Sequence, residues 1–446
     1  MFLENAFDAK RFQYKQVGKQ FVEVGNGPLH GNAKDLTRIF TARYELLLQR
    51  TLRHSIFRRS ALKDQNKGTG PDDDDECSYR FLTNTQELMG TRTKKCVFGM
   101  LCELEEGRIS LQDTQGTIQL DLSAVKKQSV GMFTFNCFVL CEGTMNAHTS
   151  LFQVDSIGFA PYERRKKTIK TFNNLHFLSM DKQQEMMALE QAQEEDTFVF
   201  MSNIYLDDNE TFSKLIKLFD GYSAVAAPPT LFVMMGNFTK KKLGSKDMKL
   251  LATLMDKLCD LLLNKYRDSL CKTSDFVLIP GPQDQLIGNV LPQPKLIGAL
   301  CSKFLGHAEQ GDIHINFQSN PFRIRFGTQE IVVFRQDLLQ KMRRNCVMVP
   351  DLAASADLTN HLCKTILDQA HLCPLPLQIC PIYWNYSHAL NLYPSPHLVV
   401  LGDSGDEGYQ WKYEDSKVVC PGGFTTTGSF IVYSPWNKDV DFSMVQ

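Results

Sequence analysis

One stretch of sequence decides the fold: Thr197-Phe198-Val199-Phe200-Met201-Ser202-Asn203-Ile204-Tyr205, an apolar run of strand length that opens into a polar loop. The same arrangement recurs at three later loops, Gly236-Asn237-Phe238, Pro280-Gly281-Pro282-Gln283-Asp284 and Leu401-Gly402-Asp403-Ser404-Gly405. Continuous apolar strands with helical patterns between them are typical of a sheet covered on both faces. In open sheets of this kind ligands gather beyond the carboxyl ends of the strands, so a site is to be sought in these loops.

The region 197–446 is predicted to form one α/β domain around these loops. Its strands are expected at 198–201, 230–235, 276–279, 331–334, 398–401 and 430–433, and its first helices at 212–219 and 248–263. The remaining chain divides into residues 1–58, an extended and helical N-terminal segment; 59–80, a disordered acidic linker; 81–162, a small barrel; and 163–196, a basic linker and helix.

Residues 81–162 alternate between apolar and polar side chains, which predicts short strands rather than helices. About five strands in this length fit a closed barrel of the oligonucleotide-binding (OB) type. Such barrels often bind single strands through aromatic and basic side chains on strands two and three. The side chains predicted to face outward there are Arg108, Ser110, Gln112, Thr117, Gln119 and Asp121. They include no aromatic residue, so a protein-facing barrel is favoured and single-strand nucleic-acid binding is kept as the alternative function.

The basic run Glu163-Arg164-Arg165-Lys166-Lys167 follows the barrel. Clustered cations attract both nuclear-import receptors and phosphates, and either role is an alternative here. A connector between two domains is the favoured interpretation of a run this short.

Composition excludes several classes of protein. The 446 residues are 43% hydrophobic with a net charge of −1, which indicates a globular chain without bulk attraction to nucleic acid or membranes. The start of the chain lacks the pattern of a secretory signal, and no apolar run is long enough to cross a membrane. The thirteen cysteines include no C-x-x-C pair, so we expect reduced core thiols in an intracellular protein.

The four loops resemble the metal-binding motifs of calcineurin-like phosphoesterases, D-x-H, G-D-x-x-D, G-N-H-[DE] and G-H-x-H. At the positions of the metal ligands this chain carries Asn203, Tyr205, Asn237, Gln283, Asp403 and Gly405. Asp284 is the one carboxylate kept at a motif position. Loss of so many ligands leaves no complete coordination shell, so we predict no metal, no cofactor and no catalytic residue. An active phosphoesterase with unorthodox ligands is a further alternative.

A phosphoesterase-like domain that has lost its metal ligands and follows an OB barrel in the chain resembles the B subunits of replicative DNA polymerases. Among these, the chain is most similar to the epsilon branch. The segments that carry the resemblance are 2–8, 111–123, 329–335, 341–347, 371–377, 380–386, 393–396 and 421–424. The resemblance implies an α/β phosphoesterase-like (calcineurin-like) sandwich domain preceded by an all-β OB-type barrel and a short helical N-terminal segment. Family members usually carry a small helical domain before the stretch that begins here at Phe2, so we expect a truncated form or an incomplete gene model.

The resemblance also implies a role. A non-catalytic accessory subunit would clasp the zinc-bearing C-terminal region of the catalytic subunit of DNA polymerase epsilon in the nucleus. It would meet other subunits and replicative helicase components, and contact DNA mainly through the complex. Tyr383, Trp384 and Tyr386 are candidate partner-binding residues, because aromatic side chains dominate protein–protein anchor points; core packing is the alternative.

Overall fold

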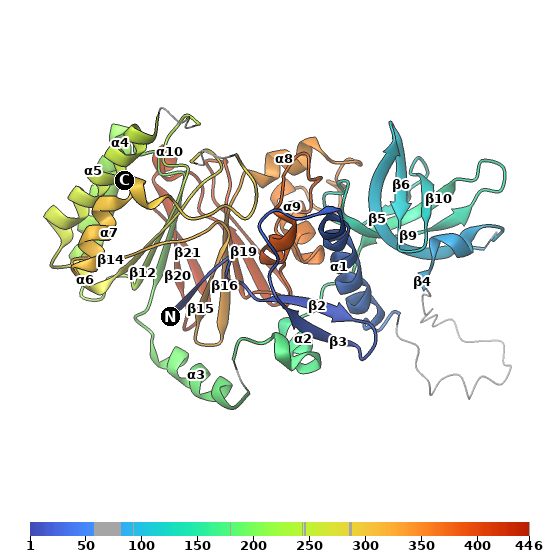
Figure 1. Cartoon of the computed structure of the whole chain (residues 1–446), viewed down its shortest axis with the longest axis horizontal. Coiled ribbons are helices and arrows are strands. Elements are labelled where there is room, and N and C mark those ends of the chain that lie inside the picture. Colours follow the sequence, from blue (N-terminus) through green and yellow to red (C-terminus); the bar gives the residue numbers. More distant parts are fainter. Residues whose placement is uncertain are drawn as a thin grey trace.

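Two six-stranded sheets packed face to face form the larger part of the molecule in the computed structural model of the chain (Figure 1). The structure describes residues 1–57, 82–91, 93–178, 180–242, 244, 247–284 and 288–445, with the side chains at 180 and 181 excepted. The predicted acidic linker at 59–80 lies outside these residues.

The first sheet has a buried, parallel centre and more exposed edge strands. Its order is β14 (His314–Phe317), β13 (Asp275–Ile279), β12 (Leu231–Met235), β11 (Phe198–Ser202), β20 (Ser429–Ser434) and β21 (Asp439–Met444). Helices α4 (Asn209–Ser223), α5 (Met248–Tyr266), α6 (Leu270–Thr273) and α7 (Ser302–Glu309) pack on its outer face through one apolar cluster. Each of these helices turns its apolar face toward the sheet, and together they cover one side of the sandwich, as the left part of Figure 1 shows.

The second sheet contains the first strand of the chain as well as late strands. Its order is β1 (Phe2–Asn5), β15 (Phe322–Phe326), β16 (Gln329–Arg335), β17 (Leu398–Gly402), β19 (Ser416–Cys420) and β18 (Tyr409–Tyr413). Its outer face is covered by α8 (Leu338–Arg344) and α9 (Leu358–Asp368). Because β1 pairs antiparallel with β15, the N-terminal segment completes a sheet of the α/β domain. The remaining short elements of this domain are η4 (Gly298–Leu300), η5 (Trp384–Leu390) and α10 (Phe424–Thr427).

The barrel is closed by five strands, as the alternation predicted. These are β5 (Lys95–Glu105), β6 (Arg108–Gln112), β7 (Thr117–Asp121), β10 (Phe152–Phe159) and β9 (Phe138–Met145), and β9 pairs back with β5. The short strands β4 (Leu82–Thr83) and β8 (Lys127–Gln128) and the turn η1 (Thr85–Leu88) flank it. Strand β9 begins only at Phe138, because the chain before it runs beside 346–347 of the larger domain.

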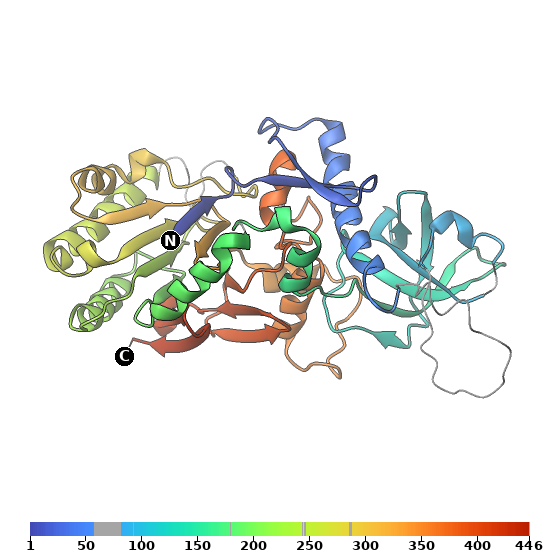
Figure 2. The same ribbon diagram turned by 90° about the horizontal axis from the view of Figure 1, so that it is seen from below.

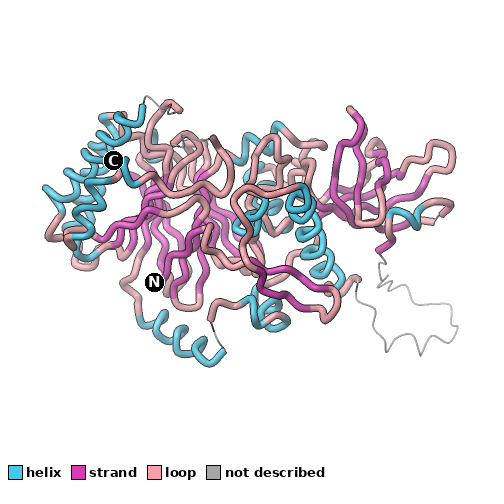
Figure 3. Tube along the Cα trace, viewed as in Figure 1, coloured by secondary structure: helices cyan, strands magenta, loops and turns pink. Residues whose placement is uncertain are grey.

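Helix α1 (Ala33–Leu52) lies between the barrel and the sandwich, where Figures 1 and 2 both place it. Asn32 caps its first turn by accepting hydrogen bonds from the Lys34 and Asp35 backbone N–H groups. The hairpin of β2 (Arg11–Lys15) and β3 (Gln20–Val24) packs beside α1, and the connector forms α2 (Arg165–Thr171), η2 (Asn173–Leu175) and α3 (Met180–Ala192). The tube in Figure 3 shows these helices between and below two groups of strands.

The cysteines and the helices can be compared with the expectations of reduced thiols and of no membrane-spanning run. All twelve cysteines among the described residues are free, and all but Cys346 are buried. Within the described part of the chain, no helix has the length and apolar character needed to span a membrane.

Candidate functional site

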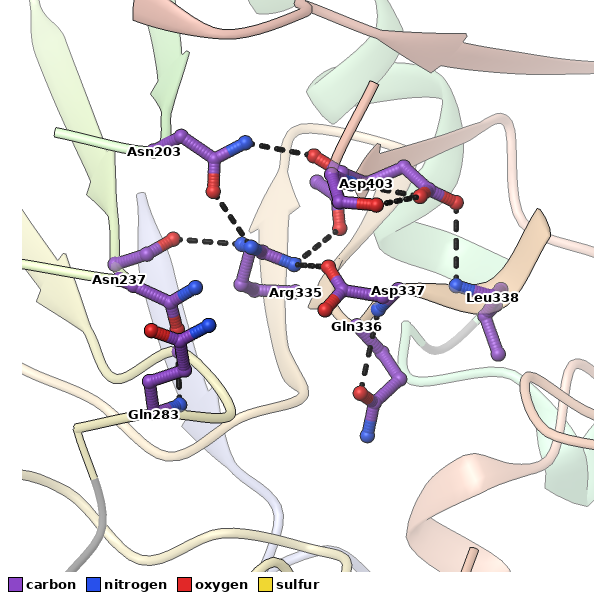
Figure 4. Close-up of polar contacts among 12 residues, drawn as sticks. Asn203, Asn237, Gln283, Arg335, Gln336, Asp337, Leu338 and Asp403 are labelled. Carbon is purple, nitrogen blue, oxygen red and sulfur yellow. Dashed lines mark hydrogen bonds and ion pairs between the residues drawn. The ribbon is translucent and has the colours of Figure 1, made fainter. Parts of the chain in front are cut away.

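A buried arginine lies among the loops predicted from the phosphoesterase motifs, and Asn203 contacts it through its side chain (Figure 4). Arg335 ends strand β16, directly after the buried run 331–334, and its side chain is 0% exposed. Its Nε donates to the Gly236 carbonyl at 2.7 Å, and its Nη2 donates to Asn203 Oδ1 at 2.5 Å. Its Nη1 donates to Asp337 at 2.7 Å and to the Gly402 carbonyl at 3.1 Å. The guanidinium therefore joins the strand ends of both sheets.

Asn203 uses both ends of its amide within the protein. Its Oδ1 accepts from Arg335, and its Nδ2 donates to the Asp403 carbonyl at 2.8 Å. Its backbone lies in the left-handed region, with φ of 57°, a conformation that asparagine tolerates better than most residues. Asn203 thus stands at the position of an aspartate ligand but acts as a bridge between two loops.

The loops after β12 and β13 hold each other by short polar contacts. The Oδ1 of Asn237 accepts from the backbone N–H of Gln283 at 2.9 Å. Asp284 accepts from the backbone N–H groups of Phe238 and Gly281, each at 2.8 Å. Burial raises the pKa of Asp284 to about 6, and these two N–H groups act in the opposite direction. The approach is close: a Cβ at Gly281 would lie 2.4 Å from Asn237 Oδ1.

Asp403 binds the first turn of α8. Its Oδ2 accepts from the backbone N–H groups of Leu338 at 3.1 Å and Leu339 at 2.9 Å, and its Oδ1 accepts from that of Ser404 at 2.7 Å. Burial raises the pKa of this carboxyl group. Gly405 is exposed and brings no side chain to the centre.

Tyr205 is half-buried, and burial raises the pKa of its phenol. The side chains in this centre do not fit a two-metal site. Two-metal hydrolysis requires carboxylates and imidazoles that hold two cations, and here the ligand positions carry three amides, a phenol, a glycine and only one carboxylate, that of Asp403. The carboxylates of Asp284 and Asp403 already accept backbone N–H donors, and a guanidinium lies among the strand ends. Across the described residues, no cluster of three or more His, Cys, Asp or Glu side chains is placed to hold a metal ion.

Arg335 was missed by motif reasoning because the motifs contain no arginine. The available signal was a charged residue at the end of the apolar run Ile331–Phe334. A charge at that place must be compensated inside the fold, since burying an unpaired one is costly.

The aromatic candidates lie under the N-terminal segment. Tyr383, Trp384 and Tyr386 are each half-buried at the start of η5. The ring of Phe7 lies 5.2 Å from that of Tyr386 and 6.5 Å from that of Tyr383. Trp384 packs so closely on Gly31 that a Cβ there would lie 3.1 Å from its ring. Only part of each ring faces outward, so their role in partner binding stays a prediction.

The basic run after the barrel is built into the junction between domains. Glu163 pairs with Arg53, the residue that follows α1, at 2.7 Å, and Arg164 pairs with Glu414 at 2.6 Å. Arg165 is buried and pairs with Glu330 of β16 at 2.7 Å. The geometry favours the connector interpretation over an accessible import or phosphate-binding signal.

The outward face of strands β6 and β7 has few of the aromatic and basic side chains that bind nucleic-acid bases. Arg108 is exposed and pairs with Glu105 at 2.5 Å, whereas Ser110, expected to point outward, is buried. Gln112 and Thr117 are exposed, and Gln119 and Asp121 are half-buried. Strands β6 and β7 carry no aromatic residue, so a stacking platform is absent from these two described strands.

Two family models match the chain. The model for the B subunit of DNA polymerases alpha and epsilon matches residues 198–408, and the model described as "DNA polymerase epsilon subunit 2-like, OB-fold domain" matches residues 33–161. The second match includes α1 together with the barrel.

Relatives match along nearly the whole chain. DNA polymerase epsilon subunit 2 of Homo sapiens is 38% identical, and that of Bos taurus is 37% identical; each alignment covers 99% of this chain and 82% of the relative. The DNA polymerase epsilon B subunit of Arabidopsis thaliana is 37% identical over 98% of this chain and 82% of its own length.

Solved structures match at a lower level. The crystal structure of TT1561 of Thermus thermophilus is 15% identical with a TM-score of 0.29, covering 56% of this chain and 99% of that chain. Vps29 of Chaetomium thermophilum is 10% identical with a TM-score of 0.26, covering 56% of this chain and 96% of that chain.

Proposed function

Because the chain belongs to the family of DNA polymerase epsilon B subunits, we propose that it holds the zinc-bearing C-terminal region of the catalytic subunit and helps to connect the polymerase to replicative helicase components. Members of this family are non-catalytic accessory subunits of a polymerase complex that belongs to the nuclear replication machinery. The specific partners, and contact with DNA through the complex, are parts of the proposal.

The observation that carries the proposal is the closed strand-end centre. The place where a phosphoesterase would hold its metals contains the Arg335 guanidinium, and the side chains of Asn203 and Asp403 there make hydrogen bonds within the protein. We infer that a domain of this size without a reactive centre functions by binding partner proteins through its surface. This supports assembly rather than hydrolysis.

Buried polar contacts at the junction support a rigid platform. Arg50 of α1 donates to the carbonyl of Ala160, beyond the last barrel strand, at 3.1 Å and to that of Asp368 in α9. Gln369 accepts from the Phe138 backbone N–H at 2.8 Å and donates to the Phe138 carbonyl at 2.7 Å. Buried polar groups tolerate few alternative arrangements, so barrel and sandwich present one continuous surface to a partner.

Co-expression with the catalytic subunit tests the proposal. We expect a stable complex whose cross-links, mapped by mass spectrometry, join this chain to the zinc-bearing C-terminal region. Failure to co-purify, or cross-links confined to other regions of the catalytic subunit, would contradict it.

The aromatic candidates have a matched control in the same chain. Trp384→Ala is expected to weaken capture of the catalytic subunit, because aromatic anchors contribute strongly to interfaces. Trp436→Ala, which removes a 40% exposed tryptophan between β20 and β21, is expected to leave capture unchanged. Equal capture by both variants, each shown by circular dichroism to be folded, would assign Trp384 to packing alone.

A further inference from the structure

A small cavity lies where helix α1, strand β2 and the turn η5 meet, and none of the strand-end loops contributes to it. Its volume is about 20 Å³, and we call it the helix cavity. One water-sized group needs roughly 10–15 Å³, so the cavity admits one or two oxygen atoms of a ligand and leaves the rest outside. The described residues that line it include three arginines, Arg11, Arg38 and Arg43, and no carboxylate.

Arg11 is a cation without a partner. It is half-buried on β2, and its guanidinium makes no hydrogen bond or ion pair with another described residue. Burial lowers the pKa of Arg11, the nearby guanidinium of Arg38 lowers it further, and Asp35 acts in the opposite direction. Two cations of the cavity therefore lie close enough to repel each other. An anion bound beside both would offset this repulsion.

Arg43 is a buried cation without a carboxylate. It is 7% exposed, and its guanidinium lies over the ring of Phe138, 5.1 Å from the centroid. Among the described residues its side chain makes one hydrogen bond, from Nη2 to Gln369 Oε1 at 3.5 Å, and its Nε atom has no partner. Burial lowers the pKa of Arg43 to about 10, so the guanidinium is still protonated at pH 7. A buried charge without a counter-ion is costly, and an anion in the cavity reduces that cost.

One carboxylate offsets part of this charge. Asp35 pairs with Arg38 at 3.1 Å and accepts from the Asn32 backbone N–H at 2.9 Å. The imidazole of His388 also lines the cavity, and burial lowers its pKa to about 4, so it is neutral at pH 7. Three guanidinium groups and one carboxylate therefore leave two positive charges at the cavity.

We propose that the helix cavity binds the phosphate group of a phosphate monoester. Such a group carries about 1.5 to 2 negative charges at pH 7 and three acceptor oxygens, which matches the two positive charges of the cavity. Guanidinium groups bind phosphate oxygens through charge-assisted hydrogen bonds. The Ser387 hydroxyl and the Asn391 amide also line the cavity and make no side-chain hydrogen bond to other described residues, so they are available as neutral donors. The carrier of the phosphate group is either a small molecule or a peptide with a phosphorylated side chain.

Calorimetric titration of the full chain tests the site with a matched pair of probes. At about pH 7.5 methyl phosphate carries nearly two charges, because its second pKa is about 6, whereas dimethyl phosphate carries one. We expect saturable one-to-one binding of methyl phosphate and at least tenfold weaker binding of dimethyl phosphate, since a hydrogen bond to a charged group changes affinity by about tenfold or more. Equal binding of both probes, or of neither, overturns the proposal.

Two further probes identify the carrier. Tighter binding of the phosphopeptide acetyl-Ala-phosphoserine-Ala-amide than of methyl phosphate supports a peptide carrier, and equal or weaker binding of the peptide supports a small molecule. A DNA duplex without terminal phosphates carries phosphodiesters alone. If the duplex binds more tightly than methyl phosphate and Arg11→Gln abolishes that binding, the cavity is a nucleic-acid contact and the assignment to a monoester is wrong.

Two substitutions beside the cavity are expected to act in opposite directions. Arg11→Gln removes one of the two excess charges and should weaken binding of methyl phosphate about tenfold. Asp35→Asn raises the excess to three charges and should tighten binding severalfold, and it keeps an oxygen acceptor for the Asn32 backbone N–H. A merely structural role of these side chains predicts no such reversal.

The control is Arg108→Gln on the barrel strand β6, a 59% exposed side chain that does not line the cavity, which should leave binding unchanged. Arg11→Gln is expected to fold, because among the described residues Arg11 has no side-chain partner that the substitution would leave unpaired. If Asp35→Asn does not fold, Arg11→Gln still tests the proposal, since unchanged binding of methyl phosphate by that variant overturns it.

Discussion

Positive charge is removed from solvent at two places in this molecule, a single arginine and a group of three, and its compensation differs between them. Each of the three nitrogen atoms of Arg335 donates a hydrogen bond to an acceptor. Arg165, Arg323 and Arg325, the arginine cluster, pair with Glu330 and Glu4, and the Nε atoms of Arg165 and Arg325 have no hydrogen-bond partner among the described residues. Arg323 and Arg325 line a cavity of about 230 Å³, the junction cavity, and Arg165 is not among its lining residues. The first arrangement pairs a single cation inside the strand-end centre, and the second borders an open cavity. Position in the fold, rather than residue type, sets this difference.

The largest effect is expected at the closed centre. Arg335→Ala should lower the free energy of unfolding by roughly 3–5 kcal/mol, because it leaves Asp337 and three buried oxygen acceptors without their cation. Urea unfolding monitored by circular dichroism measures the change. The control Arg343→Ala, on the exposed side of α8, should change stability by less than about 0.5 kcal/mol. A loss below about 1 kcal/mol for Arg335→Ala would show that the centre is not held by this side chain.

Asp284 gives the closed centre a dependence on pH. Its folded pKa of about 6 lies above its ordinary value of 3.8, so the folded state binds the proton more tightly than the unfolded state does. This carboxylate therefore costs stability as pH rises from about 4 to about 6, by roughly 3 kcal/mol at most, and adds no further change above pH 7.

Comparison with Asp284→Asn isolates that effect. The difference in unfolding free energy between the wild type and Asp284→Asn should shift against the wild type from pH 4 to pH 6 and then become flat. A difference that does not vary with pH would contradict the raised pKa.

A smaller effect is expected at the start of α8. Asp403→Ala removes the acceptor of the Leu338 and Leu339 backbone N–H groups and should cost about 1–2 kcal/mol, as the loss of a helix cap does. Glu407→Ala in the same loop, an exposed position, provides the control for urea unfolding. Equal stability of the two variants would mean that Asp403 does not act as a cap.

The smallest effect is expected in the arginine cluster. Arg325→Gln should lower the free energy of unfolding by about 1 kcal/mol, because its side chain is 25% exposed and makes a single ion pair, with Glu4. Thermal and urea unfolding without added anions give the value. A loss as large as that of Arg335→Ala would remove the distinction between a closed and an open group.

Much of the fold followed from local patterns. The alternation over 81–162 predicted the short strands of the barrel, and the apolar runs at 198–201 and 276–279 predicted central strands of the first sheet. Such patterns can be recognised in a sequence because the spacing of apolar residues differs between a strand and a helix and shows which side of the element is buried. The pairing of β1 with β15 was not predicted, since partners about 320 residues apart leave no local trace.

The sequence predicted the loops of the candidate site, through their missing metal ligands, but it did not predict the arginine at its centre. Asn203, Asn237, Gln283 and Asp403 meet as the loop positions implied. Gly405 and Tyr205 add no contact to the guanidinium among the hydrogen bonds of the described residues. The role of Arg335 depends on acceptors from four separate loops, which only the packed sheets bring together.

The sequence by itself determined the two domain types, the free thiols and the loss of the metal ligands, because each depends on residue identity and local period. Only the tertiary structure decided which charges are compensated. Arg165 appeared to be one cation of an exposed basic run, yet it is buried against Glu330, 165 residues away. Burial and partner choice arise when distant segments pack, so the closed centre at Arg335 and the open junction cavity could be seen only in the folded chain.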